Sequence, residues 1–308
     1  MKPERVPVLE IGGTHVTAAW VRTGRWGVEP GSSTRLRLDA GGSTDEVLAT
    51  IVETATAIGP AGRARWGVAI PGPFDYDRGV GDFRGVGKFA ALHGVDLGRH
   101  LGRALGAPTG CFGFVNDAHA FGIGEWAAGA ALGHPRAVAV TLGTGVGSAF
   151  LVDGVPQVAG PGVPPSGRLD LAQVRGRPLE EHVSRSAIRA AYGQHSDAAG
   201  AQPGPPDVHD IASSARAGDP AATAALAGSL TLLGSVLAPL AVDFGASAVV
   251  VGGSIVRSWD VVAGPLRAGM DAAAPGWSER FGIVAAQHLD DAALVGAAMH
   301  AVGQGACA

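Results

Sequence analysis

Two residues with the potential for chemistry, Asn116 and Asp117, stand where a predicted strand gives way to a predicted helix. The apolar run Cys111–Val115 indicates the strand, and Ala118–Gly133 indicates the helix. An ionised aspartate can accept a proton from a substrate hydroxyl that lies within hydrogen-bond reach. Asn and Asp are also favoured at helix N-termini, so capping alone is the competing interpretation. The sequence therefore offers Asp117 as a candidate general base.

A second candidate for chemistry is the glycine cluster Gly143–Gly147 (GTGVG), which separates two apolar runs. The runs Val138–Leu142 and Ala149–Val152 predict two strands joined by a tight turn. Glycine lets backbone N–H groups approach an anion closely, and the hydroxyls of Thr141 and Thr144 add donors beside them. The pattern fits a phosphate cradle, although a plain hairpin with a glycine-rich turn would have the same composition.

The N-terminal segment Val6–Val21 repeats this plan. An apolar strand reaches Gly12-Gly13-Thr14, and a second strand follows from Val16. The two glycine hairpins lie about 130 residues apart, which predicts two related domains that share one phosphate site.

Two more predicted strands end in turns that suit a ligand. Arg65–Ile70 ends at Pro71-Gly72, and Ala248–Val251 ends at Gly252-Gly253-Ser254. Ligands of α/β sheets bind beside the carboxyl ends of strands. The glycine-rich loop Asp75–Phe89 follows the first of these turns, and loops of this length are often functional.

Helical periodicity and capping signals occupy most of the remaining chain. Helices are predicted over Gly42–Gly59, Val95–Gly106, Leu179–Tyr192, Val208–Ala217, Pro220–Leu240, Trp259–Ala274 and Asp291–Ala301. A last strand is predicted over Phe281–Ala286 and a flexible loop over Ala199–Pro206. Strand hairpins followed by helices indicate an α/β protein with mixed sheets.

Composition narrows the class of protein. At 308 residues the chain is long enough for two domains, and 46% hydrophobic with 16% charged residues indicates a globular fold. A net charge of −4 argues against nucleic acid and anionic membranes as partners. No apolar run approaches the roughly 18 residues of a spanning helix, and the first residues lack the plan of a signal peptide. A cytoplasmic location is therefore expected.

The two cysteines, Cys111 and Cys307, lie far apart in the sequence. They cannot supply a cysteine-rich zinc site or a disulfide framework, and Cys307 stands in a tail that is expected to fray. Both are interpreted as free thiols.

Taken together, the order and spacing of the hairpins, the Asn-Asp junction and the Gly-Gly-Ser turn resemble the ROK family (repressor, open reading frame, kinase) of sugar kinases. The resemblance runs from Leu9 to the closing helix around Leu294–Ala298. It implies the α/β fold of actin-like ATPases (ribonuclease H-like), with two domains around a cleft. The expected domains are residues 1–115 and 116–289, with a closing helix at 290–308 that packs on the first domain.

The resemblance also implies an ATP-dependent kinase with assigned residues. Asp117 would be the catalytic base, while Asn116, Pro71 and Gly72 would bind sugar hydroxyls. ATP would be bound by Gly12, Gly13, Thr14, Thr141, Gly143, Thr144, Gly145, Gly147, Gly252, Gly253 and Ser254. The family's usual aspartate of the first hairpin is Glu10 here, which would handle Mg²⁺ with a carboxylate one methylene longer.

Two departures from the family concern the acceptor. The family's Glu-x-Gly-His segment, which contacts the sugar, is Pro165-Ser166-Gly167-Arg168 here, and the segment of its zinc cysteines, Leu171–His182, contains no cysteine. No zinc site is therefore expected. The carboxylate and the imidazole that contact the sugar in the family are therefore replaced here. The expected phosphoryl acceptor is a hexose or a sugar-like C7-cyclitol of the valiolone or valienol type. Gly87, Lys88 and Arg168 would supply replacement contacts, and a solvated loop cation is the alternative interpretation of Lys88.

Other functions compete with this one. A glucokinase proper is the nearest alternative. A non-catalytic sugar sensor or repressor would need a DNA-binding domain before the first strand, which begins near Val6. An inactive paralogue would be motivated by Glu10 and the lost segment, but the retained Asn116-Asp117 pair and both hairpins favour an active kinase. A homodimer is expected because dimers are usual in the family.

Overall fold

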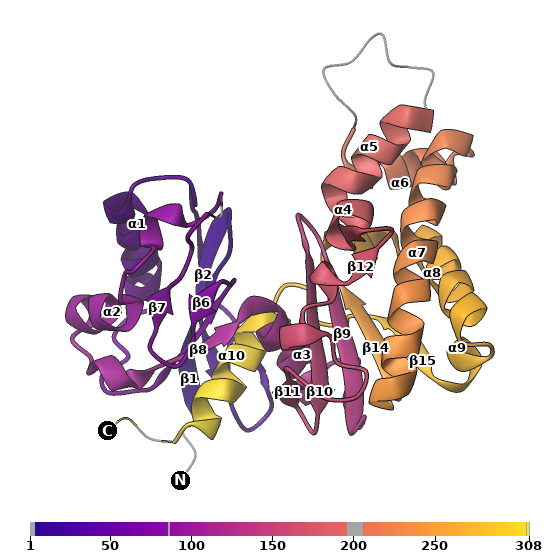
Figure 1. The fold of residues 1–308 in the computed structure, drawn as a ribbon. Coiled ribbons are helices and arrows are strands. Elements are labelled where there is room, and N and C mark those ends of the chain that lie inside the picture. Colours follow the sequence, from indigo (N-terminus) through magenta and orange to yellow (C-terminus); the bar gives the residue numbers. More distant parts are fainter. Residues whose placement is uncertain (1–3, 86, 196–205, 306, 308) are drawn as a thin grey trace. The chain divides into compact units, whose positions relative to one another are not determined.

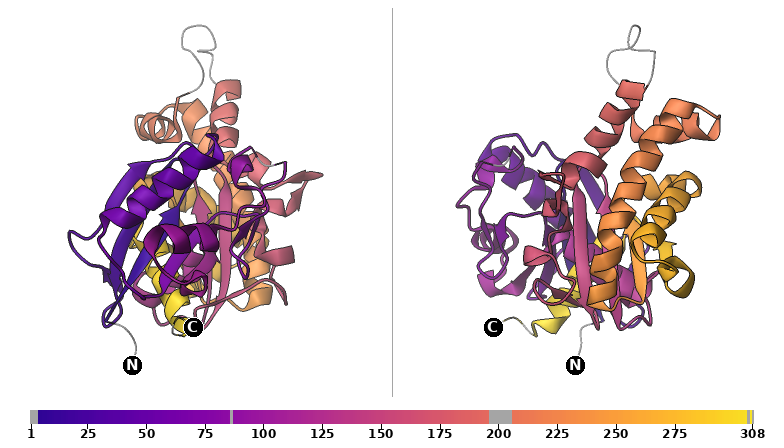
Figure 2. Two further views of the ribbon diagram at one scale, coloured as in Figure 1. Left: turned by 90° about the vertical axis from the view of Figure 1, so that its left-hand side faces the viewer. Right: turned by 45° about the vertical axis from the view of Figure 1, so that its right-hand side comes forward.

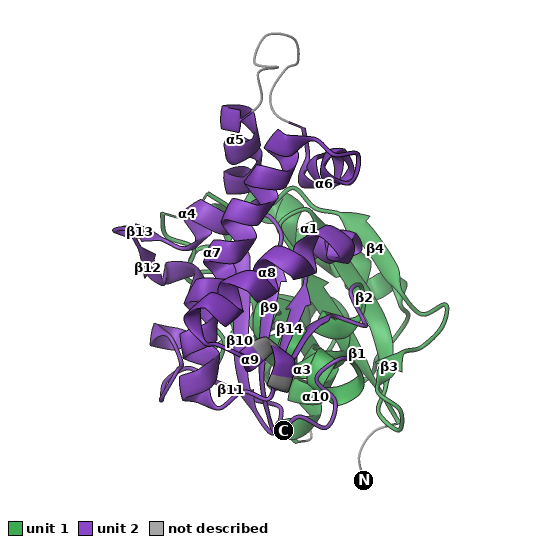
Figure 3. Ribbon diagram, turned by 90° about the vertical axis from the view of Figure 1, so that its right-hand side faces the viewer, with its two compact units in different colours: residues 1–129, 290–308 green, residues 130–289 purple. Residues whose placement is uncertain are grey.

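The computed structural model describes residues 4–85, 87–195, 206–305 and residue 307. The chain divides into two compact units (Figure 3). Unit 1 comprises Met1–Gly129 and Asp290–Ala308, and unit 2 comprises Ala130–Leu289.

Unit 1 is built on a mixed sheet with the strand order β3-β2-β1-β5-β8, and β4 also pairs with β2. Strands β1, β2 and β8 of this sheet are labelled in Figure 1. Its strands are β1 (Arg5–Ile11), β2 (His15–Arg22), β3 (Gly27–Val28), β4 (Thr34–Arg37), β5 (Trp66–Ile70) and β8 (Phe112–Asn116). Strands β1 and β2 form the predicted antiparallel hairpin, whereas β5 and β8 continue the sheet in parallel. The parallel strands bring their carboxyl ends to the edge where the first glycine turn lies.

Helices cover this sheet. They are α1 (Thr44–Ala57), α2 (Leu97–Leu105), α3 (Asp117–Ala128) and α10 (Ala292–Gly303). Helix α1 begins with a capping box in which Ser43 and Glu46 bond each other's backbone N–H, as its sequence predicts. Alternate residues of a strand face opposite sides of a sheet. Leu9 and Ile11 therefore share a core with Ile51 of α1, and Glu10 lies on the other face.

Helix α10 covers the opposite face of the sheet at very short range. A side chain at Gly67 of β5 would place its Cβ 2.2 Å from the carbonyl oxygen of Ala297. Helices α3 and α10 also touch through glycines, because a Cβ at Gly124 would lie 1.9 Å from Ala292 O and one at Gly296 would lie 1.8 Å from Ala120 O. The closing helix therefore packs in unit 1, as the family resemblance implies.

This contact moves the domain boundary. The sequence places it after residue 115, but the compact units divide after Gly129. Helix α3 belongs with unit 1 because its glycine-rich face fits the backbone of α10. A contact between helices so far apart in the sequence leaves no local signal.

The long loop of unit 1 contains a small ladder of β6 (Phe74–Asp75) and β7 (Val80–Gly81). Aromatic rings fix it to the core: Phe74 packs against Phe114 and Phe83, with ring centroids 5.3 and 6.2 Å apart, and Phe83 packs against Phe89 at 5.3 Å. The predicted loop Asp75–Phe89 is therefore anchored at both ends, while residue 86 lies outside the described residues.

Unit 2 is built on a second mixed sheet with the order β11-β10-β9-β14-β15. Its strands are β9 (Arg136–Leu142), β10 (Val146–Val152), β11 (Val155–Gln157), β14 (Ala248–Gly252) and β15 (Gly282–Ala285), with a separate pair β12 (Gln173–Val174) and β13 (Arg177–Pro178). Its helices are α4 (Glu180–Val183), α5 (Arg185–His195), α6 (Val208–Arg216), α7 (Pro220–Phe244), α8 (Trp259–Ala273) and α9 (Trp277–Arg280). Side by side in Figures 1 and 2, α7 and α8 pack so closely that a Cβ at Gly234 would lie 2.2 Å from Leu266 O.

In unit 2 two predicted helices have other bounds in the structure, and one predicted loop lies almost wholly outside the described residues. The helix predicted over Leu179–Tyr192 is broken at Ser184, whose extended backbone separates α4 from α5. The loop predicted over Ala199–Pro206 lies outside the described residues except for Pro206. Helix α7 ends at Phe244, four residues beyond the predicted end, where Gly245 adopts a left-handed conformation and closes the helix.

Helix α7 also corrects the expectation that no apolar run reaches membrane-spanning length. The helix has 25 residues and contains an 18-residue window with a mean hydropathy of 1.9, so it could cross a membrane by length and composition alone. Half of that window is buried inside the protein, and Leu230, Leu233 and Leu237 belong to the core of unit 2. We therefore assign α7 as a core helix.

The prediction of two free thiols is wrong in this structure, because Cys111 and Cys307 form a disulfide. Their Cα atoms lie 4.8 Å apart although 196 residues separate them in sequence. The end of α10 returns beside the paired starts of β5 and β8, where Arg65, the residue before β5, donates from Nε to Gly305 O at 2.8 Å. The tail is therefore held, and sequence spacing alone misses the pairing.

Candidate active site

Asn116 and Asp117 occupy the junction of β8 and α3. Asn116 is the N-cap: its Oδ1 accepts the N–H groups of Ala118 at 3.0 Å and His119 at 3.2 Å. Asp117 is the first helical residue, half-buried, and its carboxylate accepts the N–H of Ala118 at 2.9 Å. The capping role therefore belongs to Asn116, and Asp117 is placed for a second task.

The ionisation of Asp117 is set by opposing forces. Burial raises the pKa of this carboxyl above its ordinary value, while the N–H of Ala118 and the charge of Lys88 lower it, and burial prevails. A raised pKa makes an aspartate a better proton acceptor near neutral pH, as general bases require. Asp117 thus has the environment of a base, and Lys88 belongs to that environment.

A residue that the sequence analysis did not single out, Tyr76, holds Asn116. The amide Nδ2 of Asn116 donates to the phenol oxygen of Tyr76 at 3.1 Å, and that hydroxyl donates to Ile70 O at 3.2 Å. A Cβ at Gly72 would lie 3.3 Å from the same oxygen. Tyr76 therefore joins the ends of β5 and β8 to the Pro71-Gly72 turn. Its place in a long loop after Pro-Gly-Pro was the available signal.

The first glycine turn, Gly12-Gly13-Thr14, lies at the carboxyl end of β1. It closes through a 2.9 Å hydrogen bond from the N–H of Gly12 to His15 O. Lys88 lies against it: a Cβ at Gly13 would lie 3.1 Å from Lys88 Cδ and 3.2 Å from Nζ. The structure thus brings together in unit 1 the turn, Lys88 and Asp117, while Gly87 lies exposed beside Lys88.

Glu10 lies in an acidic neighbourhood on the α10 face of the sheet. Burial raises its pKa to about 7, chiefly with the help of Asp117 and also of Asp290 and Asp291, whereas Arg35 opposes the rise. Among the described residues no three His, Cys, Asp or Glu side chains are grouped to hold a metal by themselves. Mg²⁺ in nucleotide sites commonly takes only one or two carboxylates together with phosphates, so Glu10 and Asp117 fit such an ion.

The second glycine turn lies in unit 2 between β9 and β10. Leu142 pairs with Val146 across it, as the predicted hairpin requires. The N–H of Val146 donates to Glu180 Oε2 at 2.9 Å, and a Cβ at Gly145 would lie 2.5 Å from that oxygen. Among the described residues the N–H groups of Thr144 and Gly145 have no hydrogen-bond partner. The turn therefore offers two free donors. The carboxylate of Glu180 that supports it was not predicted from the sequence of the turn.

The Gly-Gly-Ser turn stands next to this hairpin. Gly252 at the end of β14 pairs with Thr141 of β9. Gly253 has φ +86°, and a Cβ there would lie 2.1 Å from Leu142 O. Ser254 is exposed and begins a short 3₁₀ helix. The residues expected to bind ATP from unit 2 are therefore adjacent, and Gly253 has a packing role of its own.

The segment that departs from the family, residues 165–168, is fixed to β10. Ser148 Oγ donates to Gly167 O at 2.7 Å and accepts the N–H of Leu169 at 3.1 Å. Arg168 makes a two-pronged ion pair with Asp170, at 3.2 and 2.5 Å. The positive charge of Arg168 is therefore partly neutralised, and its guanidinium is held on a rigid loop.

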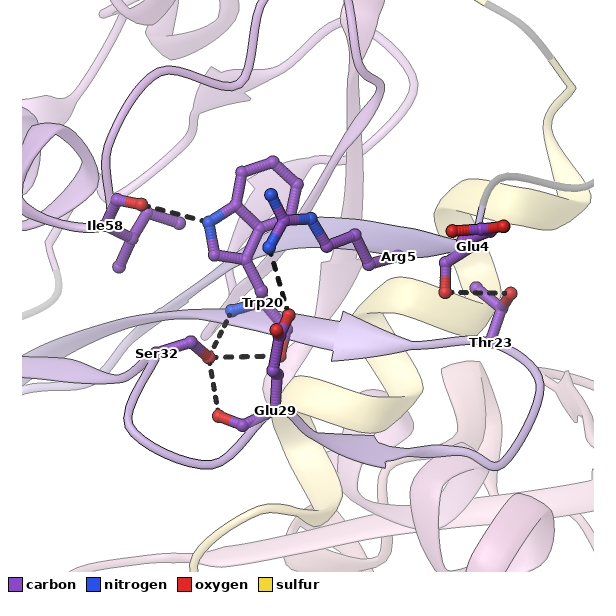
Figure 4. A network of polar contacts seen from close by, with 7 residues as sticks. All are labelled: Glu4, Arg5, Trp20, Thr23, Glu29, Ser32 and Ile58. Carbon is purple, nitrogen blue, oxygen red and sulfur yellow. Dashed lines mark hydrogen bonds and ion pairs between the residues drawn. The ribbon is translucent and has the colours of Figure 1, made fainter.

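Open cavities of about 460 and 430 Å³ lie elsewhere on unit 1 and share Arg5 and Glu29. Figure 4 shows their polar network: Arg5 lies over the ring of Trp20 at 4.2 Å and pairs with Glu29 at 3.1 Å, while Trp20 Nε1 donates to Ile58 O. Arg5 begins β1, and ligands of such sheets bind at carboxyl ends. These cavities are therefore not the candidate active site.

Comparison with known proteins identifies the family of the chain. Residues 8–303 match the ROK family. The chain is 30% identical over 274 residues to a glucokinase of Thermotoga maritima, covering 82% of this chain and 84% of that protein.

Solved structures share the fold. A ROK family glucokinase from Streptomyces griseus, in complex with glucose and AMPPNP, superposes with a TM-score of 0.77 at 23% identity over 96% of this chain and 98% of that one. A ROK hexokinase from Thermus thermophilus gives a TM-score of 0.73 at 23% identity, over 97% and 98% of the two chains. The expected actin-like ATPase fold is confirmed.

Proposed function

This chain belongs to the ROK family, and we propose that it transfers the γ-phosphoryl group of ATP to a primary hydroxyl of a hexose or of a hexose-like C7-cyclitol. The family match and the glucokinase relative support the general part of this proposal, that the chain is a carbohydrate kinase. The observation that carries the proposal is the half-buried carboxylate of Asp117 at the start of α3, with a raised pKa beside Asn116 and Lys88.

In the proposed reaction Asp117 accepts the proton of the attacking hydroxyl. The hydroxyl oxygen forms a bond to the γ-phosphorus, the bond from that phosphorus to the bridging oxygen breaks, and ADP leaves with the electron pair. Phosphoryl transfer needs positioning and charge stabilisation more than covalent help from the protein. The amide of Asn116 has one hydrogen left to donate to an oxygen of the phosphoryl acceptor. Its other amide hydrogen is bonded to Tyr76, and its oxygen already accepts the N–H of Ala118.

ATP would be bound by the glycine turns of each unit. In unit 1 the turn Gly12-Gly13-Thr14 would contact the phosphates, with the N–H of Gly12 already bonded to His15 O. In unit 2 the donors are the free N–H groups of Thr144 and Gly145, with Thr141, Gly143 and Gly147 beside them. Gly252, Gly253 and Ser254 would border the adenosine, because glycines at a strand end let the backbone approach a planar group closely.

Glu10, with Asp117 near it, would hold Mg²⁺ together with the nucleotide phosphates. When bound, the ion would neutralise charge on the phosphates during transfer. Burial, with the nearby charges of Asp117, Asp290 and Asp291, raises the pKa of Glu10 to about 7, and a cation there would favour its ionised form.

We propose a hexose or a C7-cyclitol as the acceptor because residues 165–168 cannot form the hydrogen bonds to sugar hydroxyls that a Glu-x-Gly-His segment forms. Arg168 has only donors, and Asp170 already occupies two of them. Pro71, Gly72 and Gly87 would form the rest of the acceptor surface with backbone groups. A glucokinase proper remains the alternative, favoured by the glucokinase relative.

The test is a kinase assay of the purified protein with Mg-ATP and a panel that contains glucose, mannose, valiolone and valienol. We expect turnover of at least one acceptor. Asp117→Asn should lower kcat by about 10²–10⁴-fold and leave AMPPNP affinity within twofold. Asp45→Asn, which removes an exposed carboxylate from the first turn of α1, is the matched control.

Two outcomes would overturn the proposal. The kinase assignment fails if no acceptor is phosphorylated although AMPPNP binds, and the base assignment fails if Asp117→Asn stays fully active. The expected homodimer and cytoplasmic location are further proposals, of which the first is tested by light scattering of the purified chain.

A further inference from the structure

We propose that Lys88 is a catalytic residue whose ammonium contacts the phosphoryl group in transfer, rather than a hydroxyl of the acceptor. The inference rests on the proposed function. It deepens that function by naming the cation that stabilises the transferred group, and it changes the role that the sequence suggests for Lys88.

The first support is the position of the side chain. Lys88 lies along the turn Gly12-Gly13-Thr14, with Cδ and Nζ 3.1 and 3.2 Å from the point where a Cβ at Gly13 would be. The absence of a side chain at Gly13 is what allows this approach. The turn is the phosphate-binding element proposed for unit 1, so the ammonium is on the side of the nucleotide.

The second support is how the loop holds Lys88. The next residue, Phe89, has φ +59°, donates its N–H to Ala40 O at 2.8 Å and buries its ring against Phe83. Such a left-handed conformation is costly for a non-glycine residue and needs surrounding packing to persist. The backbone at position 88 is therefore anchored, while the Lys88 side chain itself is exposed.

The third support is charge. Lys88 is near enough to Asp117 for its charge to act on that carboxylate. In the part of the chain that the structure describes, Lys88 forms no ion pair. A cation that lies against the turn of Gly13 and acts on the carboxylate of the proposed base is within reach of both the nucleotide phosphates and the attacking hydroxyl of the proposed reaction.

The chemistry of this position fits an ammonium. In phosphoryl transfer, negative charge is spread over the equatorial and leaving oxygens, and preorganised cations aimed at those oxygens stabilise the transition state. Lysine supplies three donors on a compact charge. The chain has 23 basic residues of which only two, Lys2 and Lys88, are lysines, so a lysine is unusual in this protein.

Nucleotide affinity provides a test that does not depend on the acceptor. Calorimetry would compare AMPPNP and ADP on the wild type, Lys88→Met and Lys88→Arg. We expect Lys88→Met to weaken AMPPNP by about tenfold or more, the loss of one charged hydrogen bond, and to leave ADP within twofold. Lys88→Arg should recover part of the loss. Arg84→Met removes an exposed cation from the same loop and is the matched control.

Kinetics supply the second measurement. Lys88→Met should lower kcat by about 10²-fold, the cost of one oxyanion donor, with the acceptor KM within twofold. The reverse pattern, a raised acceptor KM with unchanged kcat and AMPPNP affinity, would overturn the proposal and restore an acceptor contact. No change in any parameter would also overturn it.

The two lysines allow a direct spectroscopic check. Reductive ¹³C-methylation keeps the charge and should give two dimethyl-lysine signals besides that of the N-terminal amine, and Lys2→Arg assigns the two. AMPPNP should shift the Lys88 signal and ADP should not. If the wild type phosphorylates no acceptor, the proposed function fails, whereas the shift and the AMPPNP affinities still decide whether Lys88 contacts the γ-phosphoryl group.

Discussion

The amide of Asn116 donates a 3.1 Å hydrogen bond to the hydroxyl of Tyr76. That hydroxyl donates in turn to the carbonyl of Ile70, the residue that pairs with Asn116 in the parallel ladder. One loop side chain thus bridges two adjacent strand ends. Because Asn116 also caps α3, Tyr76 fixes the residue that precedes the proposed base.

Tyr76→Phe tests this bridge. The ring would keep its packing against Phe74, 5.3 Å away, but Asn116 would lose its acceptor and turn more freely. We expect the acceptor KM to rise about fivefold, the value of one neutral hydrogen bond, with the ATP KM unchanged. Tyr192→Phe, which removes the hydroxyl bonded to Asp219 in unit 2, is the control. Equal effects of the two variants would contradict a positioning role.

Glu10 predicts a pH dependence of stability. Its pKa is about 7 in the fold against 4.5 ordinarily, so between these values the folded chain keeps a proton that the unfolded chain releases. Stability must therefore fall as pH rises from 4.5 to 7, and the loss is complete above 7. It amounts to about 3 kcal/mol at most.

Urea unfolding without Mg²⁺ at pH 5 and pH 8 measures this effect. Glu10→Gln should match the wild type at pH 5 and be more stable than it at pH 8. Glu53→Gln, at an exposed position of α1, should follow the wild type at both values. Parallel curves for Glu10→Gln and the wild type would refute the assignment.

Two glycines of unit 2 should respond differently to alanine. At Gly253, φ is +86° and a Cβ would meet Leu142 O at 2.1 Å, whereas a Cβ at Gly143 meets nothing within 4 Å. Gly253→Ala should therefore lower the free energy of unfolding by about 3 kcal/mol or more, and Gly143→Ala by less than about 1 kcal/mol. Thermal unfolding compares them.

The same pair separates folding from binding. A methyl group at Gly143 would stand where phosphates are proposed to bind, so Gly143→Ala should raise the ATP KM by about tenfold, or 1.4 kcal/mol. An unchanged ATP KM would argue against the phosphate role of this turn.

The disulfide of Cys111 and Cys307 predicts that the unreduced, denatured protein has no free thiol and yields one cross-linked peptide. Reduction should lower stability by about 2–4 kcal/mol, since the closed loop is long. Cys307→Ser should have the stability of the reduced wild type and show no effect of reductant. Two titratable thiols in the unreduced protein would disprove the bond.

The sequence alone predicted the local elements well. Both glycine hairpins, the Asn-Asp junction and most helices follow from periodicity, turn residues and caps, which act between residues close together in the chain. The break at Ser184 was not predicted because α4 and α5 share a continuous helical pattern. The composition of α7 is likewise local, but whether it spans a membrane or fills a core depends on what packs around it.

Only the tertiary structure decided the contacts that complete the site. Tyr76 bonds to Asn116, Lys88 lies against Gly13, and Glu180 holds the turn at Val146, each across at least 34 residues. The same is true of the disulfide and of α3 against α10. Sequence spacing reports the preferences of neighbours along the chain, whereas these contacts depend on how distant segments fold back on each other. The glycine turns could therefore be predicted from the sequence, whereas the side chains that contact them could not.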